Sequence, residues 1–266
     1  MNPAASSETP IHRPRIGIPW RTSVDEEKVK TAGQMGKTED YIEAVQKAGG
    51  EAILIPLKDQ HERSRLIPTL DAFVLPGSPA DVDPNGYGCK NTGHSQEPDK
   101  PREDTDRAVL RYALAEKRPV LAICYGLQTL NVYQGGSLIQ DIHAELKDAG
   151  RKLERHRKKD EPTSTEDPWH AATLEPGSRL AVLAGSTEAR VNSSHHQAIQ
   201  KLGQNLRITA KATDDIIEGV EWTGDANWVV GVQWHPERMG DAFSERLFGD
   251  LVGAALTARG SVVQKV

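Results

Sequence analysis

The sequence predicts an α/β protein with a mostly parallel, doubly wound sheet, helices on both faces and an antiparallel β extension at its C-terminal end. Short apolar runs alternate with helical segments through the first half of the chain, an order typical of crossovers between parallel strands. These runs are apolar throughout, as in strands that are buried on both faces. Further along, several strand-like segments follow one another without helices between them, which favours a meander that continues the sheet.

The first half of the chain provides the parallel part of the sheet. Strands are expected at 15–20, 51–56, 71–76 and 119–123, and helices at 40–48, 62–70, 102–117 and 127–134. The first helix ends at Gly49-Gly50, a common stop signal. Residues 79–101 are rich in Gly, Pro, Asp and Asn, and loops of this length are often functional.

The second half of the chain has a weaker pattern. Residues 148–168 are highly charged and lack an apolar period, so we interpret them as a solvated excursion without chemistry. Strands are expected at 190–192, 206–212, 216–222 and 228–234, and an amphipathic helix at 243–258. Because the chain contains no internal repeat and no clean linker, we expect one domain at 15–258, a disordered leader at 1–14 and a flexible tail at 259–266.

Composition argues against several classes of partner. The 266 residues include 33 basic and 38 acidic side chains, a net charge of −5, so nothing indicates binding to nucleic acid or to an anionic membrane. Two cysteines make no disulfide framework, and we find neither a long apolar run nor a secretory signal pattern. We therefore expect a protein of the reducing cytoplasm with a small-molecule partner.

Cys124 lies where an apolar strand gives way to a helix. A thiol at such a turn faces the N-terminal end of the helix, where unpaired N–H groups favour the nucleophilic thiolate. Free cysteine is also among the most buried residue types, so the turn alone leaves a structural role open. For Cys89, in the 79–101 loop, we favour an incidental surface thiol.

His235 and Glu237 directly follow another strongly apolar strand, with Pro236 between them. Side chains two residues apart in an extended segment project to the same side, so the pair could serve as a base and its orienting group for a thiol. The alternative is a strand end whose polar groups meet water. In doubly wound sheets ligands gather beyond the carboxyl ends of strands, and Gly77, Cys124 and His235 each follow such an end.

The motifs of the chain resemble those of the class I glutamine amidotransferase superfamily, and within it the branch of stand-alone γ-glutamyl hydrolases that includes γ-glutamyl-γ-aminobutyrate hydrolase. The resemblance extends from Arg15 to about Leu256. It rests on residues 75–84, Tyr87-Gly88, the Cys124 turn, Asn131 with 135–141, 191–197 and 231–237. A flavodoxin-like fold is implied.

The resemblance also implies roles for individual residues. Cys124 would be the nucleophile, His235 the base and Glu237 its orienter. Backbone N–H groups of Gly77 or Ser78 and of Tyr125 would form the oxyanion hole. The positions that correspond to those holding the α-amino and α-carboxylate ends of a glutamyl group are Gln128, Ser193, Ser194, His195 and His196.

The histidines do not suggest a metal site from sequence alone. His143, His156 and His170 are scattered, whereas zinc ligands usually have tight spacing. The adjacent His195 and His196 have no third ligand that the spacing identifies. We therefore expect no metal and no cofactor.

Three positions depart from the family pattern. Ala122 and Asp215 stand where relatives tend to have glycine, and Tyr125 stands where arginine is common. A small residue at 122 preserves the turn, and Tyr125 would still contribute its N–H. The departures therefore bear on the identity of the substrate more than on the chemistry.

These observations lead to an expected function and two alternatives. We expect a cytoplasmic hydrolase, for which a homodimer is one option, that cleaves γ-glutamyl amides such as γ-glutamyl-γ-aminobutyrate or γ-glutamyl polyamines through a γ-glutamyl thioester, as in polyamine catabolism. One alternative is a glutaminase subunit that supplies ammonia to a separate synthase. The other is a non-catalytic binding module that has kept the fold, against which the complete Cys-His-Glu set argues.

Overall fold

The computed structural model describes residues 13–19, 38–147, 152–157, 167–224 and 228–263. Most of the expected leader and parts of the expected charged excursion therefore lie outside the described residues. The expected tail lies partly inside them. The last helix extends to Val263, into the range of this expected tail.

A nine-stranded sheet forms the centre of the fold, in the order β2-β1-β3-β4-β11-β10-β9-β6-β7. The strands are β1 (Arg15–Pro19), β2 (Glu51–Ile55), β3 (Ala72–Leu75), β4 (Val120–Ile123), β6 (Trp169–Leu174), β7 (Glu188–Asn192), β9 (Leu206–Ala212), β10 (Ile217–Trp222) and β11 (Val229–Val232). The first five strands of this order pair in parallel and the remaining pairings are antiparallel. The predicted fold class is confirmed.

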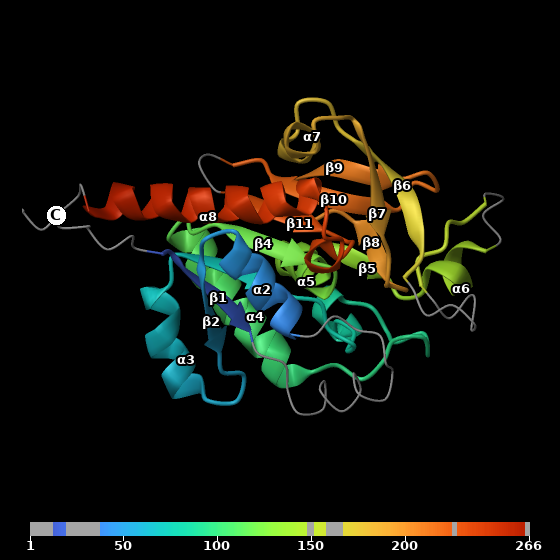
Figure 1. Cartoon of the computed structure of the whole chain (residues 1–266). Helices are drawn as coiled ribbons and strands as arrows, with labels where there is room; N and C mark the ends of the chain where they lie inside the picture. The colour runs from blue at the N-terminus through green and yellow to red at the C-terminus, as the bar shows by residue number, and fades with distance from the viewer. Residues whose placement is uncertain (1–12, 20–37, 148–151, 158–166, 225–227, 264–266) are drawn as a thin grey trace, which may run out of the picture.

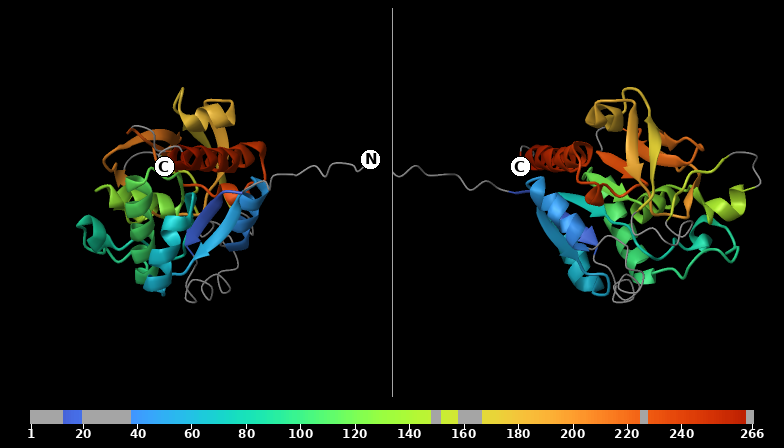
Figure 2. Two further views of the ribbon diagram at one scale, coloured as in Figure 1. Left: turned by 90° about the vertical axis from the view of Figure 1, so that its left-hand side faces the viewer. Right: turned by 45° about the vertical axis from the view of Figure 1, so that its right-hand side comes forward.

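Helices cover both faces of the parallel part (Figures 1 and 2). The helices of the described residues are α2 (Thr38–Lys47), α3 (Gln60–Leu66), α4 (Lys100–Ala115), α5 (Tyr125–Tyr133), α6 (Ile142–Leu146), α7 (Arg179–Ala184) and α8 (Ala242–Val263), with short 3-10 turns η1 (Ile67–Thr69), η2 (Pro84–Tyr87) and η4 (Pro236–Arg238). Of these, α6 and α7 lie by the antiparallel strands (Figure 1). Among the described residues, no helix combines the length and the apolar character that a membrane span requires.

The alternation of β4 explains the two layers of core. Successive side chains of a strand point to opposite faces of the sheet. Leu121 and Ile123 accordingly pack in the cluster that α2 and α8 cover, while Val120 and Ala122 pack in the cluster beneath α4 and α5. Both faces are buried, which is why this strand is apolar throughout.

Two features of the second half were not expected from the sequence. β5 (Ser137–Ile139) and β8 (Ala198–Lys201) form a separate antiparallel pair, and β6 pairs with both β7 and β9 at the far end of the main sheet. His156 is only 1% exposed, so the interpretation of 148–168 as solvated is wrong at this residue. The charged residues around His156 suggest exposure to solvent, whereas its burial comes from segments that are distant in the sequence.

Candidate active site

The candidate site lies at the carboxyl edge of three neighbouring parallel strands. β3, β4 and β11 are adjacent in the sheet. Gly77 follows the first of them, Cys124 the second and His235 the third. Parallel strands end at the same edge, so residues more than a hundred positions apart in the chain meet there.

Cys124 occupies a tight turn between β4 and α5. Its φ is 52° and its ψ is −106°, a backbone conformation that residues with a side chain rarely adopt. The Cys124 N–H donates to the carbonyl of Val232 at 2.8 Å, which ties the turn to β11. Gly126 is needed just beyond it, because a Cβ there would lie 2.2 Å from the Leu75 carbonyl oxygen.

The thiol of Cys124 is buried and is therefore protonated in the resting site. Burial raises the pKa of Cys124 to about 12, with Arg238 and the Tyr125 N–H acting to lower it and Glu237 to raise it. A neutral thiol in this position needs a nearby base before it can attack a carbonyl carbon.

His235 and Glu237 form a buried hydrogen-bonded pair. His235 Nδ1 lies 2.8 Å from Glu237 Oε1, which places the proton on Nδ1 and leaves Nε2 as the basic nitrogen. Burial and Arg238 lower the pKa of His235 below its ordinary value, although Glu237 acts to raise it. The contact with His235 holds the pKa of Glu237 low despite burial, so this pair consists of a neutral imidazole and a carboxylate.

Asn192 fixes the backbone of His235, and sequence reasoning did not assign it this role. The His235 N–H donates to Asn192 Oδ1 at 2.8 Å, and Asn192 Nδ2 donates to the His235 carbonyl at 3.0 Å. Both residues are buried. The residue stands within the 191–197 block of the resemblance, which was the available signal.

The three predicted oxyanion-hole residues lie in different surroundings. The Gly77 N–H donates to the Tyr41 hydroxyl at 3.0 Å, so it already has a partner. The Ser78 hydroxyl accepts the Ala80 N–H at 3.1 Å. The Tyr125 N–H acts to lower the pKa of the neighbouring Cys124 thiol. The Gly77 N–H is thus already occupied, and Ser78 and Tyr125 remain as candidates for contacting an oxyanion.

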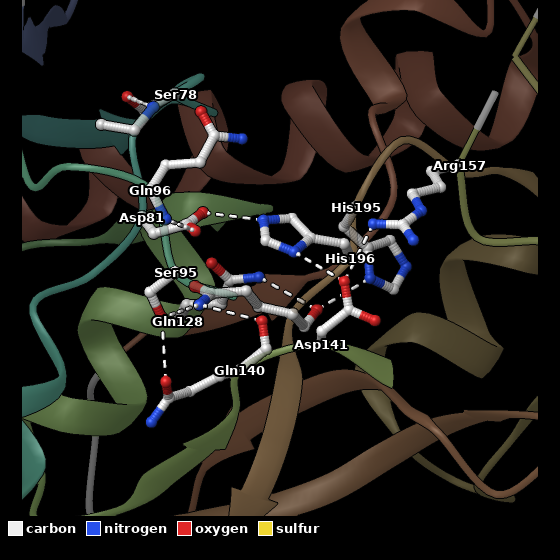
Figure 3. Close-up of polar contacts among 12 residues, drawn as sticks. Ser78, Asp81, Ser95, Gln96, Gln128, Gln140, Asp141, Arg157, His195 and His196 are labelled. Atoms are coloured by element: carbon white, nitrogen blue, oxygen red, sulfur yellow. Dashed lines mark hydrogen bonds and ion pairs between the residues drawn. The ribbon is translucent and has the colours of Figure 1, made fainter. Parts of the chain in front are cut away.

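The predicted substrate-binding residues separate into two groups. Gln128 donates to Gln197 O and Gln233 Oε1, and Ser194 is half-buried. His196 joins the polar contacts of Figure 3, with Nε2 at 3.0 Å from Asp81 and Nδ1 at 3.5 Å from Asp141. Burial lowers the pKa of His196, but these two carboxylates raise it above its ordinary value overall.

Ser193 and His195 form the second group, which turns towards other histidines. The Ser193 hydroxyl donates to the carbonyl of His156 at 3.1 Å. His195 is 5% exposed and its Nε2 lies 3.5 Å from Glu218. Gln128, Ser194 and His196 therefore remain the candidates for substrate contact.

Known proteins resemble the chain over most of its length. Residues 14–237 match the family model described as Peptidase C26. The chain is 39% identical over 218 residues to "Putative glutamine amidotransferase" of Mycobacterium tuberculosis, which covers 81% of this chain and 66% of that protein. It is 35% identical over 203 residues to γ-glutamyl-γ-aminobutyrate hydrolase PuuD of Escherichia coli, which covers 75% of this chain and 77% of that protein.

A solved structure shares the fold. It is that of a putative GMP synthase subunit from Thermoplasma acidophilum and has a TM-score of 0.63 at 16% sequence identity. The superposition covers 96% of this chain and 99% of that chain. At this level of identity the likeness is one of fold.

Proposed function

This chain belongs to the Peptidase C26 family, which is class I glutamine amidotransferase-like, and we propose that it is a cysteine-dependent hydrolase of γ-glutamyl amide bonds. Its substrates would be small molecules such as γ-glutamyl-γ-aminobutyrate or γ-glutamyl polyamines, and its products glutamate and an amine. The activity for which the Escherichia coli relative is named supports this substrate class.

One observation carries the proposal. A cysteine in a strained strand-to-helix turn and a buried histidine–glutamate pair follow neighbouring strands of the same sheet. A nucleophile, a base and an orienting carboxylate are the groups that acyl transfer through a thioester requires. We assign these roles to Cys124, His235 and Glu237.

The proposed reaction has two halves. Cys124 Sγ attacks the γ-carbonyl carbon while His235 Nε2 takes the thiol proton, and the carbonyl oxygen becomes an oxyanion. When the C–N bond breaks, His235 returns this proton to the departing amine, and a γ-glutamyl thioester remains on Cys124. A water molecule then gives a proton to His235 and attacks the thioester, and the thiol recovers this proton as glutamate leaves.

The charges of the site fit transfer of the proton during attack. The pKa of about 12 keeps Cys124 protonated at neutral pH, and the lowered pKa of His235 keeps its imidazole neutral and able to accept. Glu237 would stabilise the imidazolium that then forms. The N–H groups of Ser78 and Tyr125 would stabilise the oxyanion, and Gln128, Ser194 and His196 would hold the glutamyl end.

A substrate panel combined with labelling tests the proposal. Purified protein is offered γ-glutamyl-γ-aminobutyrate, glutamine and γ-glutamyl polyamines, and a glutamine-like electrophile is mapped by mass spectrometry. We expect turnover of at least one γ-glutamyl amide and label on Cys124, and we expect Cys124→Ala to lose both. Cys89→Ala is the matched control, since Cys89 is the other cysteine of the chain and is only half-buried. Hydrolysis by Cys124→Ala would refute the mechanism.

A glutaminase subunit is the second candidate, and the name of the Mycobacterium tuberculosis relative favours it. Such a subunit would release ammonia from glutamine for a separate synthase. Its signature would be a co-purifying protein and a glutaminase rate that stays very low until that protein is added. Rapid turnover of γ-glutamyl amides by the isolated chain would instead support the hydrolase.

A further inference from the structure

Three histidines and one glutamate meet in a buried cluster outside the proposed triad. His156 comes from the described segment 152–157, His170 from β6, His195 from the loop between β7 and β8, and Glu218 from β10. All four are 5% exposed or less. One potential ligand atom from each lies within 4.8 Å of every other.

The hydrogen bonds around the cluster orient the three imidazoles. His170 Nδ1 lies 3.1 Å from the Ala171 carbonyl, and His195 Nδ1 lies 2.9 Å from the Gln197 carbonyl. A carbonyl oxygen can only accept, so each Nδ1 carries the proton and each Nε2 presents a lone pair to the cluster. Such second contacts are the usual way in which metal-binding histidines are oriented.

In His156 the two ring nitrogens exchange roles, and a lone pair again faces the cluster. Its Nε2 lies 3.0 Å from Asp214 Oδ2, so the proton is on Nε2 and the lone pair of Nδ1 faces the cluster. Ser193 Oγ lies 3.4 Å from this Nδ1 and 3.1 Å from the His156 carbonyl. The Ser193 hydroxyl has one hydrogen and donates it to the nearer carbonyl, so Nδ1 keeps its lone pair free.

Glu218 faces these three lone pairs. Its Oε1 lies 3.5 Å from His156 Nδ1, from His170 Nε2 and from His195 Nε2. Within the described part of the chain, both Glu218 oxygens and the Nε2 atoms of His170 and His195 have no hydrogen-bond partner. Buried acceptors that face one another without a donor are unfavourable, so a proton or a metal ion between them would stabilise the cluster.

The spacing suits a metal ion better than a proton. A proton on Glu218 could bond to one of the three nitrogens and would leave the other two unsatisfied. A tetrahedral ion with bonds of about 2.1 Å places its ligand atoms about 3.4 Å apart, close to the separations observed around Glu218. Three imidazoles and a carboxylate are ligands that favour zinc among the common divalent ions.

We propose that His156, His170, His195 and Glu218 form a closed, structural binding site for one divalent transition-metal ion, with Zn²⁺ as the favoured occupant. Four protein ligands leave no open position for water or substrate, which is typical of structural sites. The ion would join the 152–157 segment and the loop of His195 to β6 and β10. It would thereby fix the loop that also carries Ser194 and His196.

Metal analysis of the full chain tests this proposal and requires no substrate. Protein produced with zinc in the medium and dialysed against metal-free buffer should retain about one zinc ion per chain. The His170→Gln variant should retain at most about one tenth of the zinc that the wild-type chain retains. His61→Gln is the matched control, since His61 is exposed on α3, and it should retain the wild-type content. Wild-type protein that carries no metal, or His170→Gln with an unchanged content, would overturn the proposal.

Two measurements on the wild-type chain decide the question if the variant fails to fold. Cobalt(II) added to metal-free protein should give the intense visible bands of a four-coordinate ion, and zinc should remove them. Chelation should lower Tm and added zinc should restore it, because an ion that binds only the folded state stabilises it. Weak six-coordinate cobalt bands, or a Tm that is the same with and without zinc, would contradict a closed site.

Discussion

The guanidinium of Arg102 lies over the ring of Tyr125, 4.9 Å from its centre. The same fully buried arginine donates to the Pro76 carbonyl at 2.5 Å and to Asp106 at 2.8 Å. Arg102 therefore joins α4 to the turn that precedes Gly77 and to the first residue of α5. These two segments carry the proposed oxyanion donors, so Arg102 is a positioning residue for both.

Removal of this arginine should affect stability and rate separately. Arg102→Met leaves Asp106 buried without its partner and should lower the free energy of unfolding by about 3–5 kcal/mol. The double variant Arg102→Met/Asp106→Leu should recover most of that stability but not kcat, because the contact with Pro76 stays lost. Urea unfolding and initial rates measure the two effects. Arg111→Met, on the exposed side of α4, is the control, and full kcat in the double variant would contradict a positioning role.

The pH dependence of the rate should depend on the two charges beside His235. A protonated imidazole cannot accept the thiol proton, so kcat/KM should fall on the acid side, with a midpoint below the ordinary histidine value of 6.5. Glu237→Gln removes a charge that raises the pKa of His235 and should move this limb to lower pH. Arg238→Gln removes one that lowers it and should move the limb to higher pH.

These shifts are read from profiles of kcat/KM between about pH 5 and pH 8. His61→Gln, far from the site in the sequence and exposed on α3, should leave the profile unchanged. A flat wild-type profile, or shifts of the same sign in both variants, would show that His235 is not the titrating base.

Gly77 leaves room for the imidazole of His235. A Cβ at this position would lie 2.8 Å from His235 Cε1 and 3.1 Å from the Tyr41 hydroxyl. Gly77→Ala should therefore displace the base and lower kcat strongly. Gly249→Ala makes the same chemical change inside α8, where a Cβ would meet nothing within 4 Å beyond its chain neighbours and the backbone of its own helix, and should stabilise the helix by about 0.5–1 kcal/mol. Wild-type kcat in Gly77→Ala would argue against this placement of His235.

Asn192 holds the backbone of His235 through two hydrogen bonds. Asn192→Ala leaves a buried donor and a buried acceptor without partners, which should cost about 1–3 kcal/mol of unfolding free energy. The base loses its fixed position, so kcat should fall more than KM changes. The exposed Asn91→Ala should change stability by less than about half a kcal/mol. An Asn192→Ala enzyme that is merely less stable would reduce this residue to a structural role.

The sequence predicts the parallel strands well, and it picks out the triad candidates, because both depend on local patterns. Apolar runs mark β3, β4 and β11, and Cys124 and His235 directly follow two of them. The environment of Tyr125 is different, since Arg102 reaches it from another helix and no local pattern indicates that contact.

No local sequence pattern indicates the histidine–glutamate cluster either. Its members are spread over more than sixty positions, and His156 stands among charged residues that suggest solvent. The buried His156 side chain has its partner in a distant turn, where Asp214 accepts a hydrogen bond from its Nε2. Spacing rules for metal ligands detect only sites whose ligands are close in sequence, and this cluster is assembled by the sheet.

The backbone of Cys124 has a consequence for how such a protein changes under selection. A φ of 52° at a residue with a side chain typically costs about 1–3 kcal/mol, and glycine adopts it freely. Cys124→Gly should therefore be inactive yet more stable than Cys124→Ala. Selection for heat resistance and selection for turnover would therefore act in opposite directions at this one position.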